Sequence, residues 1–247
     1  TVLLGFLKNA LAVGYFAAAT KVMQMLLTMS SCLGSVMMPR ASHLIAENKE
    51  VEFNRLIQKS YDFTLAIALP MTIGLIFCAP SLITALCGVK FEHSILPSQI
   101  IAPIILMVAI SNVFGIQVLF PKGKINIVTL CCGIGALADL ILNLCLIPFF
   151  SYIGTSIAYL GAEVATTVSM YLIGRKYIPI IYFKKSHLTY ALGCVVMALA
   201  LYGISLLQLP TLTTLLVQGF CGVLTYFIIL CICKDEMLVQ LLSKFKR

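Results

Sequence analysis

Residues 125–174 read INIVTLCCGIGALADLILNLCLIPFFSYIGTSIAYLGAEVATTVSMYLIG, two apolar runs joined by only a few residues. An apolar run of about 20 residues spans a bilayer as a helix, because only a helix satisfies its own backbone hydrogen bonds where there is no water. A short connection between two such helices makes them antiparallel neighbours. This stretch therefore predicts a pair of adjacent membrane-spanning helices.

Comparable runs occur along the whole chain and predict an all-α, polytopic membrane helix bundle. About seven full helices are expected, and the residues before Leu11 are interpreted as the end of an eighth. The expected spans are 12–38, 62–86, 98–120, 125–148, 152–174, 187–207 and 211–233.

Basic residues lie almost entirely in every second loop. Of the 17 Lys and Arg residues, fourteen fall in one set of loops, two (Lys8 and Lys90) in the other set, and Lys21 inside a span. Basic loops are retained on the cytoplasmic side, so the pattern predicts a cytoplasmic C-terminus in a multi-pass protein of a cytoplasmic membrane. The net charge of +8 follows from this bias and gives no reason to expect nucleic-acid binding.

The composition excludes an ordinary soluble domain, since 61% of the residues are hydrophobic, only 11% are charged and the mean hydropathy is +1.05. Most cysteines fall inside spans, where Cys acts as a small apolar side chain. We therefore expect no metal site, no cofactor and no structural disulfide. The chain opens with Thr1 inside an apolar run, and we expect it to be a fragment that lacks an N-terminal part.

Two further features concern the loops and the helix breakers. The longest loop, about 39–61, is expected to carry a short amphipathic helix on the cytoplasmic face, built on Val51, Phe53, Leu56 and Ile57. Pro and Gly inside spans are expected either as ordinary membrane-helix residues or as hinges. The hinge candidates are Pro70, Gly74 and Pro103.

Polar residues inside the spans recur at steps of three and four, so each set shares one helix face. The first set is Lys21, Gln24, Thr28, Ser31 and Ser35; the second is Ser156, Tyr159, Glu163, Thr167 and Tyr171; the third is Gly135, Asp139 and Asn143. Asn112 and Gln117 are weaker polar positions in the 98–120 span.

An intramembrane charge costs about 2.5–3.5 kcal/mol at the bilayer centre, so it usually faces a partner or a water-filled cavity. One interpretation is that Lys21 and Glu163 neutralise each other as a packing pair. The other is that the polar faces line a hydrophilic cavity, in which Lys21 would attract an anionic group such as a phosphate. The spans 187–207 and 211–233 contain no Asp, Glu, Lys or Arg and are expected to be peripheral helices that face lipid.

Several segments, in their order and spacing, resemble the C-terminal half of a Wzx-like polysaccharide flippase, in the multidrug/oligosaccharidyl-lipid/polysaccharide exporter superfamily. The segments are VGYFAAATKV (13–22), MPRAS (38–42), KSYDFTLAIALPMTIGLIF (59–77), LCGVKFEHS (86–94), IQVLFPKGK (116–124), LNLCLIPFF (142–150) and IGTSIAYLGAEV (153–164). The resemblance implies that Pro39 and Arg40 form a turn at the cytoplasmic face. It also implies the Val-Gly-Tyr element at Val13–Tyr15 and the Gly-Ala-Glu element at Gly161–Glu163.

The resemblance further implies one lobe of a two-lobe transporter that moves undecaprenyl-diphosphate-linked sugar repeat units across the membrane, without covalent chemistry. The implied divisions are 1–10 (a truncated helix and outer loop), 11–176 (the lobe) and 177–247 (two extra helices and a basic tail). The implied partners are the polyprenyl-diphosphate-linked glycan, membrane lipids, a missing N-terminal lobe, and a polysaccharide polymerase with its chain-length machinery.

Other functions stay open at this point. A cation-coupled drug antiporter of the same superfamily would use Asp139 or Glu163 as its coupling carboxylate. A lipid II flippase would differ only in cargo. A membrane enzyme, such as a polymerase or an acyltransferase, and a purely structural partner role are further alternatives.

Overall fold

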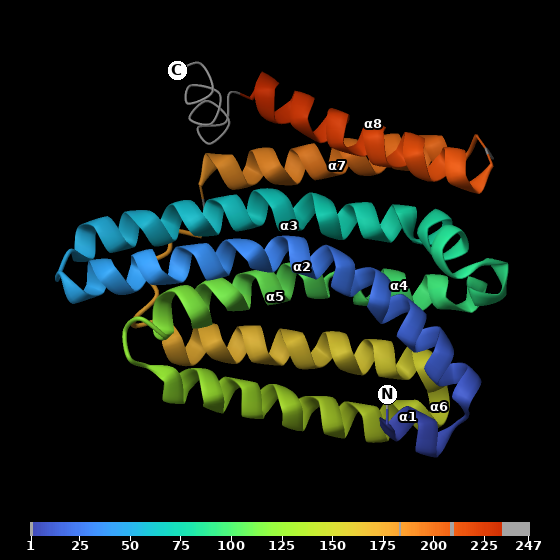
Figure 1. The fold of residues 1–247 in the computed structure, drawn as a ribbon, viewed down its shortest axis with the longest axis horizontal. Helices are drawn as coiled ribbons and strands as arrows, with labels where there is room; N and C mark the ends of the chain where they lie inside the picture. Colours follow the sequence, from blue (N-terminus) through green and yellow to red (C-terminus); the bar gives the residue numbers. More distant parts are fainter. Residues whose placement is uncertain (1, 183, 208–209, 234–247) are drawn as a thin grey trace.

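The computed structural model describes residues 2–182, 184–207 and 210–233, with the backbone alone described at 29–36 and 185. These residues form a bundle of long helices that run side by side (Figure 1), and no strand occurs among them. The predicted all-helical bundle is confirmed. In chain order the elements are α1 (Val2–Leu7), α2 (Ala10–Ala46), α3 (Glu50–Cys87), η1 (Val89–Ser94), α4 (Ile95–Ile101), α5 (Ile104–Asn112), the π-helix η2 (Val113–Leu119), α6 (Ile125–Gly174), α7 (Lys185–Ser205) and α8 (Thr211–Ile232).

Helix α6 is a hairpin, because the chain reverses at Ser151, whose backbone has φ 51° and ψ −128°. Its two arms correspond to the predicted spans 125–148 and 152–174. The arms approach closely where one of them carries glycine. A Cβ on Gly154 would lie 2.6 Å from the carbonyl oxygen of Leu146, and one on Gly161 would lie 2.6 Å from a methyl carbon of Leu142. Small residues let membrane helices pack at short range, so these glycines hold the hairpin together.

The helices are long and apolar enough to cross a membrane. Five of them meet this condition as single elements: α2 over Ala10–Thr28, α3, α6, α7 and α8. The segments Val89–Ile101 and Ile104–Leu119 meet it together, with a bend of 42° between them. The α6 hairpin supplies two crossings instead of one. The chain is therefore a polytopic membrane protein.

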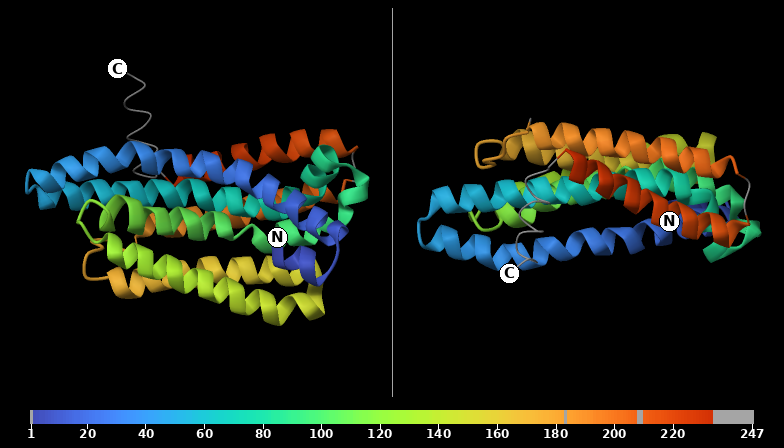
Figure 2. Two further views of the ribbon diagram at one scale, coloured as in Figure 1. Left: turned by 60° about the horizontal axis from the view of Figure 1, so that its bottom comes forward. Right: turned by 90° about the horizontal axis from the view of Figure 1, so that it is seen from above.

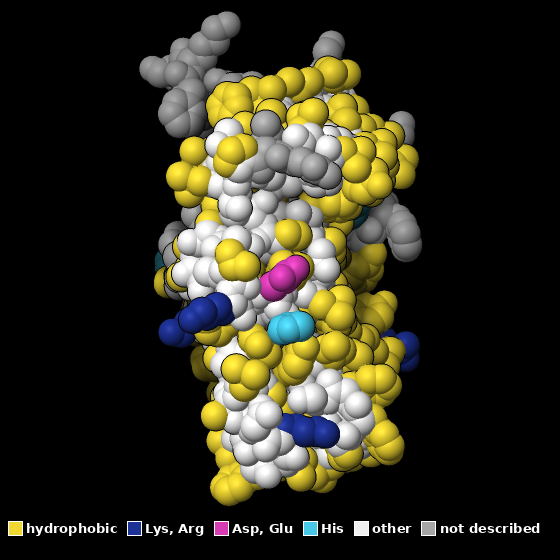
Figure 3. All heavy atoms as spheres, turned by 90° about the vertical axis from the view of Figure 1, so that its right-hand side faces the viewer, with side chains coloured by type: hydrophobic (Ala, Val, Ile, Leu, Met, Phe, Trp, Pro, Cys, Tyr) yellow, Lys and Arg dark blue, Asp and Glu magenta, His cyan; other side chains and the backbone are white. Residues whose placement is uncertain are grey.

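The described basic loops meet at one end of the bundle, which we call the basic end. There the Nζ atom of Lys122 donates to the carbonyl oxygen of Tyr177 at 3.1 Å and lies 5.1 Å from the ring centre of Phe53. At the opposite end, Lys8 donates to the carbonyl oxygen of Pro148 at 2.9 Å. Figure 3 views this opposite end, where few charged side chains are seen among hydrophobic ones. The basic residues 234, 244, 246 and 247 lie outside the described residues.

The predicted cytoplasmic loop is mostly helical, so two expectations are wrong. Helix α2 continues to Ala46, which places Pro39 and Arg40 inside a helix and not in a turn. Helix α3 begins at Glu50, so the expected separate surface helix is only the first part of α3. The connection shrinks to residues 47–49.

Packing explains why these helices extend beyond the expected spans. Ala41 and Leu44 of α2 are buried in one cluster with three residues of the first turns of α3, namely Phe53, Leu56 and Ile57. Val51, which was expected on the same apolar face, is 78% exposed. The apolar face therefore joins α3 to α2 instead of lying on a lipid surface.

The hinge candidates differ in what the backbone does. Helix α3 passes through Pro70 and Gly74 as one continuous element. Pro103 lies between α4 and α5, where the bend of 42° occurs. A Pro disrupts the helix because it removes a backbone donor and its ring crowds the preceding turn. A role for any of the three as a moving hinge stays a prediction.

Helices α7 and α8 form an outer layer that packs on α3 (Figures 1 and 2). Many of their apolar side chains are exposed, including Leu188, Leu199 and Phe220. Polar side chains of α8 also contact α3. Tyr226 donates to the carbonyl oxygen of Ala66 at 2.8 Å, and Ser81 lies 3.3 Å from Gln218. This arrangement is the one expected of peripheral helices beside lipid.

The close approach of the α6 arms generates a stability prediction. Gly154→Ala places a methyl group against the Leu146 backbone, which cannot move aside as a side chain does, and overpacking of this kind costs about 1–3 kcal/mol. We expect a lower thermal midpoint in detergent, measured by size-exclusion chromatography after heating. The matched control is Gly133→Ala on the first arm, where nothing lies within 4 Å. Equal midpoints for the two variants would contradict the packing argument.

Candidate functional site

A pocket of about 530 Å³ lies between α5, η2 and the two arms of α6. It is built where the π-helix η2 interrupts the regular turn pattern beside the hairpin; π-helical turns are rare and occur often at functional sites. Its polar lining residues are Ser111, Asn112, Asp139, Tyr159, Glu163 and Thr166. Four of the predicted site residues, Asn112, Asp139, Tyr159 and Glu163, are thus brought together.

The two carboxylates of the pocket differ in their partners. Asp139 accepts a hydrogen bond of 2.9 Å from the side chain of Asn143, one helical turn further along the first arm. Glu163, on the second arm, makes no side-chain hydrogen bond or ion pair with the described residues. No Lys or Arg lines the pocket. The pocket therefore offers acceptors to a ligand, and it favours neutral or cationic groups over anionic ones.

Six predicted site residues lie outside the pocket lining, and three of them make hydrogen bonds inside the bundle, two of these across helix contacts. Gln117 is buried on η2 and accepts a 2.5 Å hydrogen bond from the hydroxyl of Ser60 on α3. Thr167 is buried and donates to the carbonyl oxygens of Met107, at 3.2 Å, and Glu163, at 2.8 Å. Asn143 is buried and bonded to Asp139.

The polar face of α2 is separate from the pocket. Lys21, Gln24 and Thr28 are exposed on the surface of the chain, and Thr28 donates to the carbonyl oxygen of Gln24 at 2.9 Å. Lys21 forms no ion pair with Glu163 within the described part of the chain, so the structure does not show the packing pair that was one of the two interpretations. The side chains of Ser31 and Ser35 lie outside the described ones.

The position of Lys21 requires something to cover it. It lies eleven residues from the start of α2, which at a rise of about 1.5 Å per residue places it near the middle of the span. A cation exposed to hydrocarbon at that depth is costly. We therefore expect the exposed face of α2 to border a polar chamber or another polypeptide in the membrane.

The sequence pattern missed some pocket residues. Ser111 and Thr166 line the pocket beside the expected Asn112 and Glu163. Thr166 lines the pocket, and its neighbour Thr167 of the predicted stripe does not. The close approach of Gly135 to Thr166, where a Cβ would collide with the hydroxyl, is visible only in the packed hairpin. Among the described residues, no three His, Cys, Asp or Glu side chains group as a metal site would need.

A membrane-embedded helix bundle with a polar pocket and an exposed polar face defines a polytopic transporter-like membrane protein. Comparison with known proteins narrows this class. The sequence profile of the family described as "Polysaccharide biosynthesis protein" matches residues 1–96. A protein described as an O-antigen transporter of Escherichia coli (strain K12) is 27% identical over 177 residues, which cover 70% of this chain and 42% of that protein.

The fold matches a solved structure more completely. The lipid II flippase MurJ, in its inward closed conformation, superposes with a TM-score of 0.81 at 17% sequence identity. The match covers 96% of this chain and 50% of the flippase. The chain thus spans about half the length of the relatives that it matches. The sequence resemblance first seen in short motifs is confirmed by the family match and the O-antigen transporter, and the bundle shares its fold with half of the solved flippase.

The buried Ser60–Gln117 contact gives a second prediction. Gln117→Leu leaves the Ser60 hydroxyl unpaired in an apolar cluster, and Ser60→Ala does the same to Gln117, at a cost of about 1–3 kcal/mol each. The double variant removes both polar groups and is expected to recover most of the lost stability. Denaturation of the four proteins in detergent measures the coupling energy. Strict additivity of the two single effects would show that the contact is not formed.

Proposed function

We propose that this chain is one lobe of a flippase that moves polyprenyl-diphosphate-linked oligosaccharide repeat units across the cytoplasmic membrane. The observation that carries the proposal is the mid-membrane polar face of α2, exposed in a chain that spans half the length of its relatives. A second lobe opposite this face would enclose a hydrophilic chamber. The sequence similarity to an O-antigen transporter and the flippase fold support the same cargo class.

The chamber would lower the barrier to moving a glycolipid headgroup. Sugar hydroxyls and a diphosphate are too polar to cross hydrocarbon unaided, because their hydrogen bonds to water would be lost. Lys21 supplies a positive charge for the diphosphate, and the acceptors of the pocket suit sugar hydroxyls. The polyprenyl chain stays in lipid. Rocking of two lobes would expose the chamber to each side in turn, so that no covalent step is needed.

The orientation follows from the charge distribution. The basic end, where the described basic loops meet, would face the cytoplasm, and the C-terminus would lie there too. We propose residues 11–176 as the lobe and residues 177–247 as a peripheral helix pair with a basic tail. Membrane lipids, the other lobe and the polymerase with its chain-length machinery are the proposed partners.

One observation favours a second function. A pocket with two carboxylates and no basic lining residue suits a cation, as a cation-coupled antiporter would require. The relatives favour a lipid-linked substrate over a small drug, and a lipid II headgroup would be an alternative cargo in the same chamber.

Lys21 tests the chamber directly. Lys21→Ala removes the charge and Lys21→Arg keeps it, so we expect surface polysaccharide to fall at least about tenfold in the first variant only, the effect of losing one charge-assisted interaction. The assay uses a flippase-deficient strain that carries the longest reading frame containing this chain, at matched membrane levels. Met25→Ala, at an exposed apolar position of the same helix, is the control. Full activity in Lys21→Ala would reject a role for this charge.

A substitution at a pocket carboxylate distinguishes the two candidate functions. Glu163→Gln keeps the size and hydrogen-bonding capacity of the side chain and removes its charge. If the pocket holds sugar hydroxyls, polysaccharide export should drop only about two- to fivefold, less than the loss of a full charge-assisted interaction. An antiporter should instead lose gradient-dependent efflux of a small cationic dye altogether. Dye efflux by the unchanged protein, without any polysaccharide phenotype, would favour the antiporter.

A further inference from the structure

The connection between α6 and α7 is tied to α3 at the basic end, and we call its residues 175–182 the strap. The side chain of Gln58 on α3 binds the backbone of Ile181 in both directions. Its Oε1 atom accepts from the Ile181 amide at 2.8 Å, and its Nε2 atom lies 3.4 Å from the Ile181 carbonyl oxygen. Gln58 therefore ties the strap to α3 by hydrogen-bonding both the amide and the carbonyl group of Ile181.

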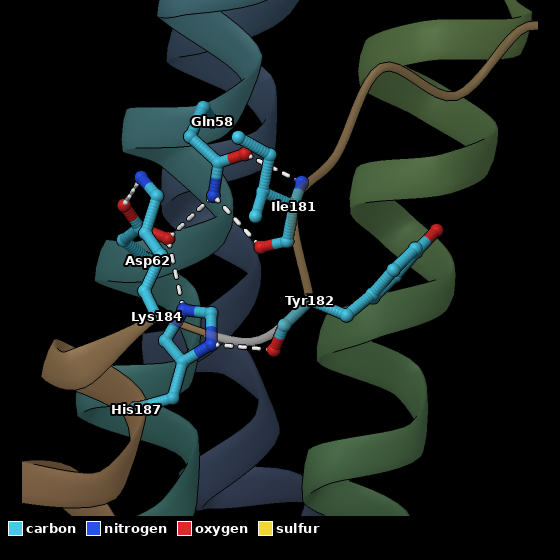
Figure 4. A network of polar contacts seen from close by, with 6 residues as sticks. All are labelled: Gln58, Asp62, Ile181, Tyr182, Lys184 and His187. Atoms are coloured by element: carbon cyan, nitrogen blue, oxygen red, sulfur yellow. Dashed lines mark hydrogen bonds and ion pairs between the residues drawn. The ribbon is translucent and has the colours of Figure 1, made fainter.

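Asp62, one turn after Gln58, is the centre of the same network (Figure 4). Its Oδ2 atom accepts from Lys184 at 2.9 Å. Its Oδ1 atom accepts from Gln58 at 2.8 Å and lies 3.0 Å from Nε2 of His187, at the start of α7. The side chain of Asp62 is only 12% exposed. A carboxylate buried to this degree depends on its partners, and the loss of one is expensive.

Each ring nitrogen of His187 faces an acceptor oxygen. Nε2 faces the carboxylate of Asp62, and Nδ1 lies 2.7 Å from the carbonyl oxygen of Tyr182. Both neighbours are acceptors that carry no proton to give. Only the doubly protonated imidazolium, which donates from both nitrogens, satisfies the two contacts at once. In a neutral ring one nitrogen carries no proton, so at one of the two contacts that nitrogen and an oxygen, both acceptors, would face each other.

What the network holds in place is the ring of Tyr182. This ring packs against Tyr61 of α3, Phe114 of η2 and Tyr171 of α6, with centroid distances of 6.0, 6.5 and 5.3 Å. Its hydroxyl is buried and has no hydrogen-bond partner among the described residues. Burial raises the pKa of this hydroxyl above its ordinary value, so the phenol stays neutral. The ring thus packs against three helical elements while its hydroxyl has no partner among the described residues.

The groups that face His187 can be named from each neighbouring element. They are Asp62 and the ring of Tyr61 on α3, Tyr182 of the strap, Lys184 before α7, and the ring of Tyr190 on α7. Asp62 is the anion of this set, and Lys184 is occupied by its other oxygen. In the seated form both ring nitrogens of His187 therefore face an acceptor, whereas release of the strap removes the Tyr182 carbonyl and leaves Asp62 of α3 beside His187 of α7.

We infer that His187 and Asp62 form a proton-dependent latch that keeps Tyr182 seated and the strap closed on α3. A neutral His187 is compatible with the released form, where Nδ1 has lost its acceptor neighbour, but not with both contacts of the seated form, so a rise in pH favours release. Histidine side chains gain and lose this proton between about pH 5 and 8, a window that includes neutral pH. The latch needs no assumption about cargo, and its failure would leave the proposed flippase function untouched.

Because the chain contains no tryptophan, the fluorescence of a single introduced Trp reports on one position only. Tyr182→Trp introduces a single indole at the seated position. Between about pH 5.5 and 8.5 we expect its emission maximum to move to longer wavelength and its quenching by acrylamide to increase. The population of the released form should rise roughly ten- to hundredfold, the effect of losing a hydrogen bond to a charged group.

The matched controls use the other histidines. Adding His187→Gln to the reporter should remove the pH response, since glutamine does not titrate. Adding His43→Gln should leave it unchanged, because His43 pairs with Glu47 at the α2–α3 turn, away from the strap. A response that persists in the His187→Gln protein, or no response in the parent, would overturn the latch.

A second measurement keeps Tyr182 in place, so its result does not depend on how the larger indole ring packs. Hydrogen exchange of residues 177–190, corrected for the intrinsic pH dependence, is compared in the protein with Tyr182 intact and in its His187→Gln variant. Protection that falls with pH only in the former supports the latch. Equal pH profiles in both proteins would reject it.

Discussion

A polypeptide in hydrocarbon has no water to hydrogen-bond its backbone, and the rest of this structure depends on that constraint. Every crossing must be a helix, and a reversal of the chain must happen where polar backbone groups find partners or water. The α6 hairpin shows the consequence, since the chain turns at Ser151 and the arms on either side remain helical. Because apolar side chains gain nothing by leaving lipid, contacts between helices rely on close packing at glycines such as Gly154 and on a few buried polar pairs.

The same constraint explains how much of the fold could be predicted from sequence. Runs of apolar residues and the alternation of basic loops are imposed by the bilayer, so the spans 125–148 and 152–174 appear in the structure as the two arms of α6. The bilayer does not determine how far a helix extends beyond it. There the length of α2 depends on packing: Phe53 is buried against the end of α2, and Pro39 lies inside that helix. A proline is a helix breaker only where packing offers no compensation.

Prediction of the pocket was partial for a related reason. Helical spacing identifies which residues share a face, but a face has no direction until the helix is packed. Asp139 and Glu163 lie on different arms of one hairpin, and the short connection was enough to bring them to one pocket. Thr167 fits the same spacing but hydrogen-bonds across a helix contact, as does Gln117, a weaker polar position of another span. The tight approach at Gly135, which brings Thr166 into the pocket lining, depends on coordinates of both arms.

The charged residues of the bundle fall into two kinds, and the difference separates structure from function. Asp62 is surrounded by donors from three directions, so its burial costs little and it fixes the position of the strap. Lys21 and Glu163 have no such partners among the described residues, although both lie within membrane-spanning helices. An unpaired charge at that depth destabilises the bundle unless water, a ligand or another polypeptide meets it. The unpaired side chains are therefore where this chain is expected to meet such a partner, and the paired ones are where the bundle is held together.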